Sequence, residues 1–358
     1  MSTRIAFLAI TEAHQFLHWL PVALRLAREP GIEVTVLGST DAGLDFIRSY
    51  DPDKLLQLHK LRTWGSRQRG LFDIPARLGT LLLNLPTVMR FPFIVTTETT
   101  SGKLKRIPGF RPRLIHLKHG AGDREGSYNP KHALADLTLV NGPKDRERLI
   151  ARGLATDQDC VVVGYAKFEL VREPEPIFAD AKPIALYNPH FDPGLSSWLG
   201  HGEAIVRQME AIEGWNFVVA PHVKLTEGPN VQSSASNLLI DRGSVRSIDM
   251  SYTEAANVYI GDVSSQVYEF LRRSRPCIFL NLDRIDWRSN ENYMHWHLGQ
   301  VIESIEELGP ALARADELQP SFEPLQRELV ERSIDPSPIP ASERQARAIL
   351  DFIARSQR

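Results

Sequence analysis

Residues Asn257–Asp283 have the sequence NVYIGDVSSQVYEFLRRSRPCIFLNLD, and this stretch shows the architecture of the chain most plainly. The β-rich run Val258–Ile260 ends at a Gly-Asp pair, and apolar residues at helical spacing follow two serines. Pro276 ends the expected helix, and a second apolar run, Cys277–Leu280, comes directly after it. A strand, a turn, a helix and a second strand within about 25 residues predict a parallel sheet.

The two serines at the start of that helix, Ser264 and Ser265, allow two interpretations. A helix N-terminus leaves backbone N–H groups unpaired and carries partial positive charge, so two added hydroxyls suit it to a phosphate. A serine at the same position also caps a helix without any ligand, and such caps are far commoner than phosphate sites. The local pattern leaves both interpretations open.

The alternation of strands and helices extends over the whole chain. A strand at Arg4–Ile10, a helix at Phe16–Arg28 and a strand at Glu33–Leu37 predict the start of a doubly wound sheet. A second series of the same kind begins at Ile184–Tyr187. We therefore expect an α/β fold with two Rossmann-like domains. The expected boundaries are 1–165 for the N-terminal domain, 166–183 for a linker, 184–335 for the C-terminal domain and 336–358 for a final helix packing back across both.

Composition excludes several classes of protein. The chain has 358 residues with 42 basic and 44 acidic side chains, so its bulk charge predicts no nucleic-acid partner. Its two cysteines, Cys160 and Cys277, lie in apolar runs and cannot form a disulfide framework. The first residues do not resemble a signal peptide, and no apolar run reaches membrane-spanning length. We expect a cytoplasmic protein.

Polar residues follow four of the expected strands directly. They are His119, the segment Asn188–Asp192, His222 with Lys224, and Ser264 with Ser265. Ligands of α/β sheets bind at the carboxyl ends of strands, so we expect these groups to converge on one ligand. Each group also has an ordinary structural explanation by itself, and the combination is the stronger argument.

The sequence His119-Gly-Ala-Gly-Asp123 presents a histidine at a strand end. The glycines allow a tight turn, and histidine titrates near neutrality, so His119 is a candidate general base that Asp123 orients, unless Asp123 holds the substrate. The loop after the first strand adds the acceptor-side candidates Glu12, His14 and His18. For each of these residues a structural role is the alternative.

Missing motifs narrow the chemistry. The chain lacks the phosphate-binding loop GxxxxGK[ST], a GxGxxG after the first strand, the GxSxG elbow and the metal-ligand spacings HExxH and CxxC. The pair Asp51-Pro-Asp53 has the spacing of metal-dependent glycosyltransferases, but its setting favours a plain β-turn. We expect no metal and no cofactor.

Two basic stretches suggest a further contact. Arginines alternate with Trp64 and leucines between Arg62 and Arg90, and Lys103 to Lys118 contains six basic residues and no acidic one. Basic side chains mixed with aromatic ones suit peripheral contact with an anionic membrane or binding of an anionic polymer, and a solvated basic face is the alternative.

The region from Leu114 to Asp283 resembles the CDP-glycerol glycerophosphotransferase family of teichoic-acid-type polymerases and primases. The resemblance rests on His119-Gly, Tyr187-Asn-Pro, Pro221-His222 and above all on Gly261-Asp-Val-Ser-Ser followed by Arg275-Pro. It implies a GT-B architecture, in which two Rossmann-like domains face each other across a cleft and the C-terminal one binds a CDP-alcohol.

The resemblance also implies roles for residues. His119 corresponds to the family's proposed base, and His222 with Ser264 and Ser265 to groups around the pyrophosphate. The full set of expected donor or phosphate-binding residues is Gly120, Asn188, His190, His222, Lys224, Asp262, Ser264, Ser265 and Glu269. The chain departs from the family's His-Gly-Thr-Pro motif, lacks its arginine after Tyr187-Asn-Pro and has Ala220 in place of the Arg of its Arg-x-His-Pro motif.

These features predict a transferase that moves a glycerol-phosphate-like group from a CDP-activated donor to a hydroxyl of a glycan or lipid-linked acceptor of the cell envelope or capsule. The altered motifs leave three alternatives open. The first is a GT-B glycosyltransferase with a nucleotide-sugar donor, the second a UDP-sugar epimerase, and the third a GT-B-shaped binding module without catalysis.

Overall fold

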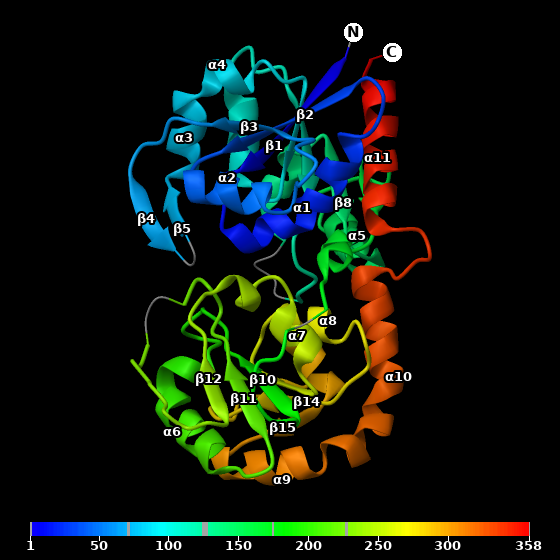
Figure 1. Ribbon diagram of the computed structural model, residues 1–358. Helices are drawn as coiled ribbons and strands as arrows, with labels where there is room; N and C mark the ends of the chain where they lie inside the picture. The colour runs from blue at the N-terminus through cyan, green and yellow to red at the C-terminus, as the bar shows by residue number, and fades with distance from the viewer. Residues whose placement is uncertain (1, 70–71, 124–127, 174, 226–227, 358) are drawn as a thin grey trace. The chain divides into compact units, whose positions relative to one another are not determined.

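The computed structural model describes residues 2–357 apart from 70–71, 124–127, 174 and 226–227, and the chain divides into two compact units (Figure 1). Unit 1 contains Met1–Ala121, Tyr128–Leu170 and Arg332–Arg358, and unit 2 contains Val171–Glu331 together with Gly122 and Asp123. The predicted α/β class with two sheets is confirmed. The final helix, however, belongs to unit 1 rather than to both units, and unit 2 begins at Val171 within the expected linker.

Unit 1 is built on a seven-stranded sheet in which every neighbouring pair of strands is parallel, in the order β3-β2-β1-β6-β7-β8-β9. The strands are β1 (Thr3–Ala9), β2 (Ile32–Gly38), β3 (Gln57–Lys60), β6 (Phe93–Thr96), β7 (Arg113–Leu117), β8 (Leu137–Val140) and β9 (Cys160–Val162). The inner strands are continuous apolar runs because helices cover both of their faces.

Helices and short 3-10 segments complete unit 1. They are α1 (Ala13–Leu26), α2 (Asp41–Arg48), α3 (Arg77–Leu83), α4 (Leu85–Val88), α5 (Pro143–Ala151), α11 (Ala341–Ser356), η1 (Thr100–Arg106), η3 (Pro130–Leu134) and η4 (Ala166–Leu170). A hairpin of β4 (Ser66–Arg69) and β5 (Phe72–Pro75) precedes α3. Helix α11 lies against α1 and η4, which explains why the C-terminus joins this unit (Figure 1).

Two elements of unit 1 begin at other residues than predicted. Helix α1 begins at Ala13, three residues before the predicted start, so that most of the expected polar loop is helical and His14 lies on the helix. The sequence also predicts a strand at Lys54–Leu58, but strand β3 begins three residues later, at Gln57. The delay has a local cause, because the Asp51 carboxylate accepts hydrogen bonds from the backbone N–H groups of Leu55 and Leu56 at 2.9 Å and extends the turn.

Unit 2 is built on a six-stranded parallel sheet in the order β12-β11-β10-β13-β14-β15. The strands are β10 (Ile184–Asn188), β11 (Asn216–Val219), β12 (Leu238–Ile240), β13 (Val258–Gly261), β14 (Cys277–Leu280) and β15 (Gln300–Ile302). The helical segments are α6 (Ser197–Ala211), α7 (Ser251–Ala255), α8 (Gln266–Phe270), α9 (Leu308–Ala313), α10 (Ala315–Ile334), η5 (Val245–Ser247), η6 (Glu291–Leu298) and η7 (Ile305–Glu307).

The strand, turn, helix and strand predicted between Asn257 and Asp283 are present, but the helix is short. Helix α8 has five residues and ends at Phe270. It therefore stops before Arg272, Arg273 and Arg275, which would favour the last turn of a longer helix. Arg275 instead donates hydrogen bonds to the carbonyl oxygens of Ala256, at 2.7 Å, and Phe270. Its guanidinium therefore completes two helix ends, which the pattern of apolar residues could not reveal.

Candidate functional site

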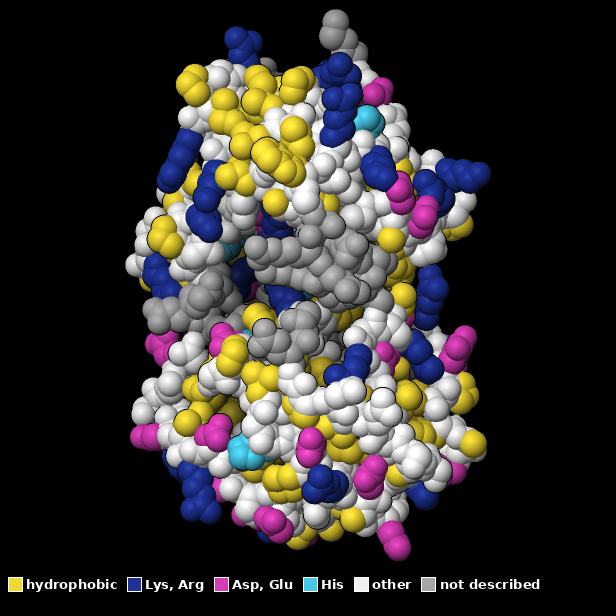
Figure 2. Space-filling view, turned by 90° about the vertical axis from the view of Figure 1, so that its left-hand side faces the viewer, with side chains coloured by type: hydrophobic (Ala, Val, Ile, Leu, Met, Phe, Trp, Pro, Cys, Tyr) yellow, Lys and Arg dark blue, Asp and Glu magenta, His cyan; other side chains and the backbone are white. Residues whose placement is uncertain are grey.

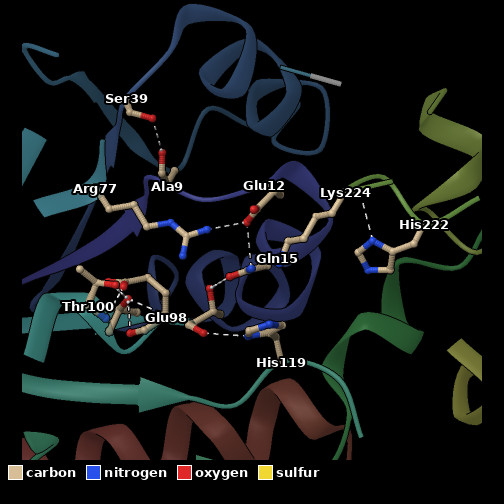
Figure 3. Close-up of polar contacts among 12 residues, drawn as sticks. Ala9, Glu12, Gln15, Ser39, Arg77, Glu98, Thr100, His119, His222 and Lys224 are labelled. Carbon is tan, nitrogen blue, oxygen red and sulfur yellow. Dashed lines mark hydrogen bonds and ion pairs between the residues drawn. The ribbon is translucent and has the colours of Figure 1, made fainter. Parts of the chain in front are cut away.

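His119 is the best-defined reactive group of unit 1. It follows β7, and its ring Nδ1 lies 2.7 Å from the carbonyl oxygen of Thr97, just beyond β6 (Figure 3). A carbonyl oxygen only accepts hydrogen bonds, so Nδ1 carries the proton. The other ring nitrogen, Nε2, then holds a lone pair, which is the arrangement that a general base requires.

The acceptor-side candidates lie near this histidine. The ring centroids of His14 and His18, both on α1, lie 6.3 and 6.1 Å from that of His119, and Tyr165 packs edge-on against His18 at 5.0 Å. Burial lowers the pKa of His18 well below its usual range, and the neighbouring charge of Lys167 acts in the same direction. His18 is therefore neutral and adds no positive charge beside His119.

Glu12 belongs to a neighbouring network. Its buried carboxylate accepts hydrogen bonds from Arg77 at 2.7 Å and from Gln15 at 3.1 Å, and Gln15 in turn accepts one from the Thr97 hydroxyl (Figure 3). Thr97 thus contacts both the network and His119. The sequence pattern missed Gln15, Arg77 and Thr97, because they belong to α1, α3 and the end of β6, which are far apart along the chain.

The backbone after His119 is held by residues of the next strand end. Gly120 has φ +69°, a conformation that favours glycine, and its carbonyl oxygen accepts a hydrogen bond from Asn141 at 2.9 Å. Lys144 donates to the carbonyl oxygen of Ala121 at the same distance. Asn141 and Lys144 follow strand β8 directly, so the signal used for the other candidates could have identified them. Gly120 serves the turn, and the described contacts are made by its backbone.

Asp123 differs from the expectation that it orients His119. Its carboxylate accepts a hydrogen bond from the Tyr268 hydroxyl at 2.5 Å and lies 3.3 Å from Nδ1 of His295, both in unit 2. The hydrogen-bond partner that the structure gives to His119 Nδ1 is the Thr97 carbonyl. Asp123 therefore belongs to unit 2 by its contacts.

The other three predicted strand ends do converge. Strands β11, β10 and β13 are adjacent in the sheet of unit 2, so the residues that follow them lie along one edge. Nδ1 of His190 accepts a hydrogen bond from the backbone N–H of Asp192 at 3.0 Å, and Nδ1 of His222 accepts one from that of Lys224 at 3.1 Å. Both rings therefore carry their proton on Nε2 and present it as a donor.

An aromatic ring lies between these two donors. The ring centroid of Phe191 lies 4.3 Å from that of His190 and 4.8 Å from that of His222. The ammonium of Lys224 lies 5.4 Å from the same centroid. Phe191 lies within the predicted segment Asn188–Asp192 but was not among the residues expected to bind the donor. The cluster offers two neutral N–H donors and one cation, a combination that suits an anionic group such as a phosphate.

Asp262 holds the backbone of this edge together. One oxygen of its buried carboxylate accepts hydrogen bonds from the backbone N–H groups of His190 and Ser197, both at 3.0 Å. Burial raises the pKa of Asp262 to about 6. These contacts assign Asp262 a positioning role, whereas the sequence analysis placed it among the donor-binding groups.

The two serines have different environments. Ser264 is buried, and its hydroxyl pairs with the side-chain oxygen of Asn188 at 3.0 Å and accepts from the backbone N–H of Gln266 at 3.3 Å. Ser265 holds the N-cap position of α8 without a capping hydrogen bond from its side chain, and Ser264, one residue earlier, binds the first N–H of the helix instead. Ser265 is exposed and keeps its hydroxyl at the surface. Glu269 is buried on α8.

In the described part of the chain, no group of three or more His, Cys, Asp or Glu side chains is arranged to hold a metal ion. Asp51 uses its carboxylate to close a turn, and Asp53 pairs with Arg28 at 3.2 Å, which agrees with the turn interpretation of this acidic pair. Independence of metal stays a prediction.

The basic stretches are partly neutralised. Lys105 and Arg113 both pair with Asp136, at 2.5 and 3.0 Å, and Lys118 pairs with Asp145 in the interior at 2.6 Å. Among the described residues of unit 1, the exposed large hydrophobic ones are Trp64, Leu82, Leu83, Met89 and Ile339, and Figure 2 shows hydrophobic side chains gathered on the face that it draws. Among the described residues, no helix has the length and apolar character needed to cross a membrane.

Comparison with known proteins supports the architecture. No protein-family model and no curated protein matches the sequence. Among solved structures, the wall teichoic acid polymerase TagF has a TM-score of 0.70 and 13% identity, over 99% of this chain and 90% of that chain. The UDP-GlcNAc 2-epimerase of Neisseria meningitidis bound to UDP-GlcNAc has a TM-score of 0.60 and 11% identity, over 98% and 100%.

MnaA from S. aureus in complex with UDP is also similar, with a TM-score of 0.63 and 14% identity over 99% of this chain and 97% of that chain. Identities this low establish the fold alone. The chain has the GT-B-like α/β fold of these proteins, with parallel sheets of seven and six strands.

Proposed function

We propose that this protein is a GT-B transferase that moves a glycerol-phosphate-like group from a CDP-activated donor to a hydroxyl of a glycan or lipid-linked acceptor. The observation that carries the proposal is the state of His119. Its Nδ1–H bond to the Thr97 carbonyl leaves Nε2 as an acceptor, as deprotonation of a hydroxyl demands. Among the similar folds, that of the wall teichoic acid polymerase TagF supports this class of reaction.

Unit 2 has the groups that the donor needs. When the bond between the transferred phosphoryl group and the nucleotide breaks, negative charge develops on the departing phosphate, and fixed N–H donors stabilise that charge. His190 and His222 present such donors on Nε2, Lys224 adds a positive charge and Ser265 an exposed hydroxyl. The acceptor hydroxyl loses its proton to His119, and its oxygen forms the new bond to phosphorus.

A nucleotide-sugar donor is the second candidate, and a specific observation favours it. The family that the sequence resembles has an arginine after its Tyr-x-Pro motif, whereas this chain has Phe191 and Asp192 there. Two of the similar folds are also those of proteins solved with UDP-GlcNAc or UDP. A UDP-sugar transferase would use His119 in the same way, while an epimerase would need no acceptor.

A binding panel separates these candidates. The full-length protein would be heated with CDP-glycerol, CDP-ribitol, CMP, UDP, UDP-sugars, GDP-mannose or CMP-sialic acid, and its unfolding temperature recorded. A ligand at 100 times its Kd that binds only the folded state stabilises it by about 2.7 kcal/mol, which is a readable shift. A cytidine-selective response supports polyol-phosphate transfer. A uridine-selective response moves the function to sugar transfer or epimerisation, and turnover of a UDP-sugar without acceptor identifies the epimerase.

We also propose peripheral attachment to an anionic membrane through α3 and α4. Leu82, Leu83 and Met89 expose between 41% and 48% of their surface on or beside these helices. Arg62 and Arg90 are exposed close by in the chain, and the side chain of Asn84 bonds the backbone of Arg62, which holds it beside the start of α4. Apolar side chains flanked by cations suit the surface of anionic lipids.

A further inference from the structure

Asp123 and His295 form a buried pair in unit 2 that the proposed chemistry does not use. Their side chains are 0% and 2% exposed, and the Asp123 carboxylate lies 3.3 Å from Nδ1 of His295. The same carboxylate oxygen accepts a hydrogen bond from the Tyr268 hydroxyl at 2.5 Å. A carboxylate in the interior requires such partners, because an unpaired buried charge costs several kcal/mol.

The second nitrogen of His295 defines the proton content of the pair. Nε2 lies 3.0 Å from the backbone carbonyl oxygen of Asp262, which only accepts, so Nε2 carries a proton. The contact between Nδ1 and the Asp123 carboxylate needs a further proton between two acceptors. Asp123 and His295 therefore share one proton in addition to the proton on Nε2. Each ring nitrogen of His295 takes part in one hydrogen bond, Nδ1 with the Asp123 carboxylate and Nε2 with the Asp262 carbonyl.

These bonds enclose the turn Gly261–Ser265, which we call the donor turn. His295 and Trp296 both donate to the carbonyl oxygen of Asp262 within it, at 3.0 and 3.2 Å. Tyr268 connects Asp123 to α8, the helix that follows the turn. Gly122 lies against the turn as well, since a Cβ at this position would be only 3.0 Å from Cβ of Ser265.

We infer that Asp123 and His295 are positioning residues that hold the donor turn in the geometry that binds the nucleotide's phosphates. This inference rests on the proposed function. Asp262 is the connecting residue, because its carbonyl oxygen is held by His295 while its carboxylate holds the backbone N–H of His190. Loss of the pair removes the hydrogen bond that holds the Asp262 carbonyl. The hydroxyl of Ser265 and the ring N–H of His190 then lose their fixed distance from each other.

The experiment measures the affinity of the full-length protein for CDP and UDP by calorimetric titration, well below the unfolding temperature. Asp123→Ala and His295→Ala should each weaken binding of the preferred nucleotide by about tenfold. The double variant should bind no more weakly than the weaker single variant, because residues of one network are not additive. Asp123→Asn should bind within about twofold of wild type, since an amide nitrogen in place of the shared oxygen can donate one hydrogen to the Tyr268 hydroxyl and the other to Nδ1 of a His295 protonated on Nε2.

The matched control is Asn216→Leu. Asn216 is equally buried in unit 2 and donates a hydrogen bond to Asp180 at 2.6 Å, but it lies at the amino end of β11, opposite to the strand ends of the site. This variant should lose stability while keeping its nucleotide affinity. Equal affinity of wild type and Asp123→Ala would overturn the inference alone, as would an equal loss in Asn216→Leu. A wild-type protein that binds neither nucleotide would overturn the proposed function and this inference together.

Discussion

At the scale of single residues, the hydrogen-bond partner decides what each histidine can do. His119 donates through Nδ1 to a carbonyl and keeps a lone pair on Nε2, whereas His190 and His222 accept at Nδ1 and keep a proton on Nε2. One tautomer suits removal of a proton and the other suits stabilisation of negative charge. All three follow strands in the sequence, which does not distinguish them.

The base assignment predicts the behaviour of His119→Asn. The asparagine amide can still donate to the Thr97 carbonyl, so the loop should keep its shape, but the group cannot take up a proton. Turnover with the donor that the panel identifies should fall roughly 10²- to 10⁴-fold, while nucleotide affinity stays within about twofold. His59→Asn is the control, because His59 is an exposed histidine on β3. Unchanged turnover in His119→Asn would remove the base from the mechanism.

The raised pKa of Asp262 predicts a pH dependence of stability. The folded-state pKa of about 6 exceeds the ordinary aspartate value of 3.8, so the folded state binds this proton more tightly than the unfolded state. The contribution of Asp262 to the free energy of unfolding therefore falls as the pH rises from about 4 through 6. Asp262→Asn should remove this decline, which amounts to about 1 kcal/mol between pH 5 and pH 7. Urea unfolding of both proteins at the two pH values measures it; parallel pH profiles would contradict the assignment.

At the scale of elements, Arg275 shows how a motif that suggests a function can have a structural role. The Arg-Pro pair supported the resemblance to a family of transferases, yet the guanidinium lies against the Phe270 ring at 3.8 Å and bonds carbonyl oxygens that end α7 and α8. A five-residue helix has little dipole of its own and few internal hydrogen bonds. The donor turn therefore depends on tertiary contacts rather than on helix propensity.

Arg275→Lys tests this role. A lysine keeps the charge but loses the planar fork that reaches several carbonyl oxygens at once, so the free energy of unfolding should drop by about 2 kcal/mol. Arg273→Lys is the matched control, since Arg273 is half-exposed and bonds Glu254 at the surface. Its loss should stay below about 1 kcal/mol. Urea unfolding of both variants gives the comparison, and equal losses would contradict the structural role of Arg275.

At the scale of the whole molecule, exposed apolar and basic side chains of unit 1 form the surface that we propose for membrane attachment. The exposed leucines of α3 lie next to η1, which carries the exposed cations Lys103 and Arg106. Hydrophobic insertion and attraction to anionic lipid are both weak alone and become effective together. Under the proposed function, this surface would bring the protein to a lipid-linked acceptor.

Vesicle co-sedimentation tests the proposed surface. Wild type should bind vesicles of phosphatidylglycerol and phosphatidylcholine more tightly than vesicles of phosphatidylcholine alone. Leu82→Ser and Leu83→Ser should each weaken that binding by about fivefold, because about half of each side chain is already in contact with protein. Leu325→Ser, at a similarly exposed leucine of α10, should have no effect. Binding that does not respond to anionic lipid or to the α3 variants would refute the attachment.

The sequence predicted the features that depend on local periodicity. The strand at Cys277–Leu280 was located correctly, because an apolar run directly after a proline is a local signal. The short strand Gln300–Ile302 and helix α10 were missed. Three residues carry little periodicity, and α10 contains two prolines that normally argue against a helix.

The sequence by itself determined the α/β class, the two parallel sheets and the polar residues that follow the strands, because alternation and strand-end position are properties of neighbouring residues. The tertiary structure alone decided which partner each of those residues has. Thr97 instead of Asp123 orients His119, and Asp123 joins His295, 172 residues away along the chain. Hydrogen bonds between distant loops leave no local pattern, since folding and not spacing brings their atoms together.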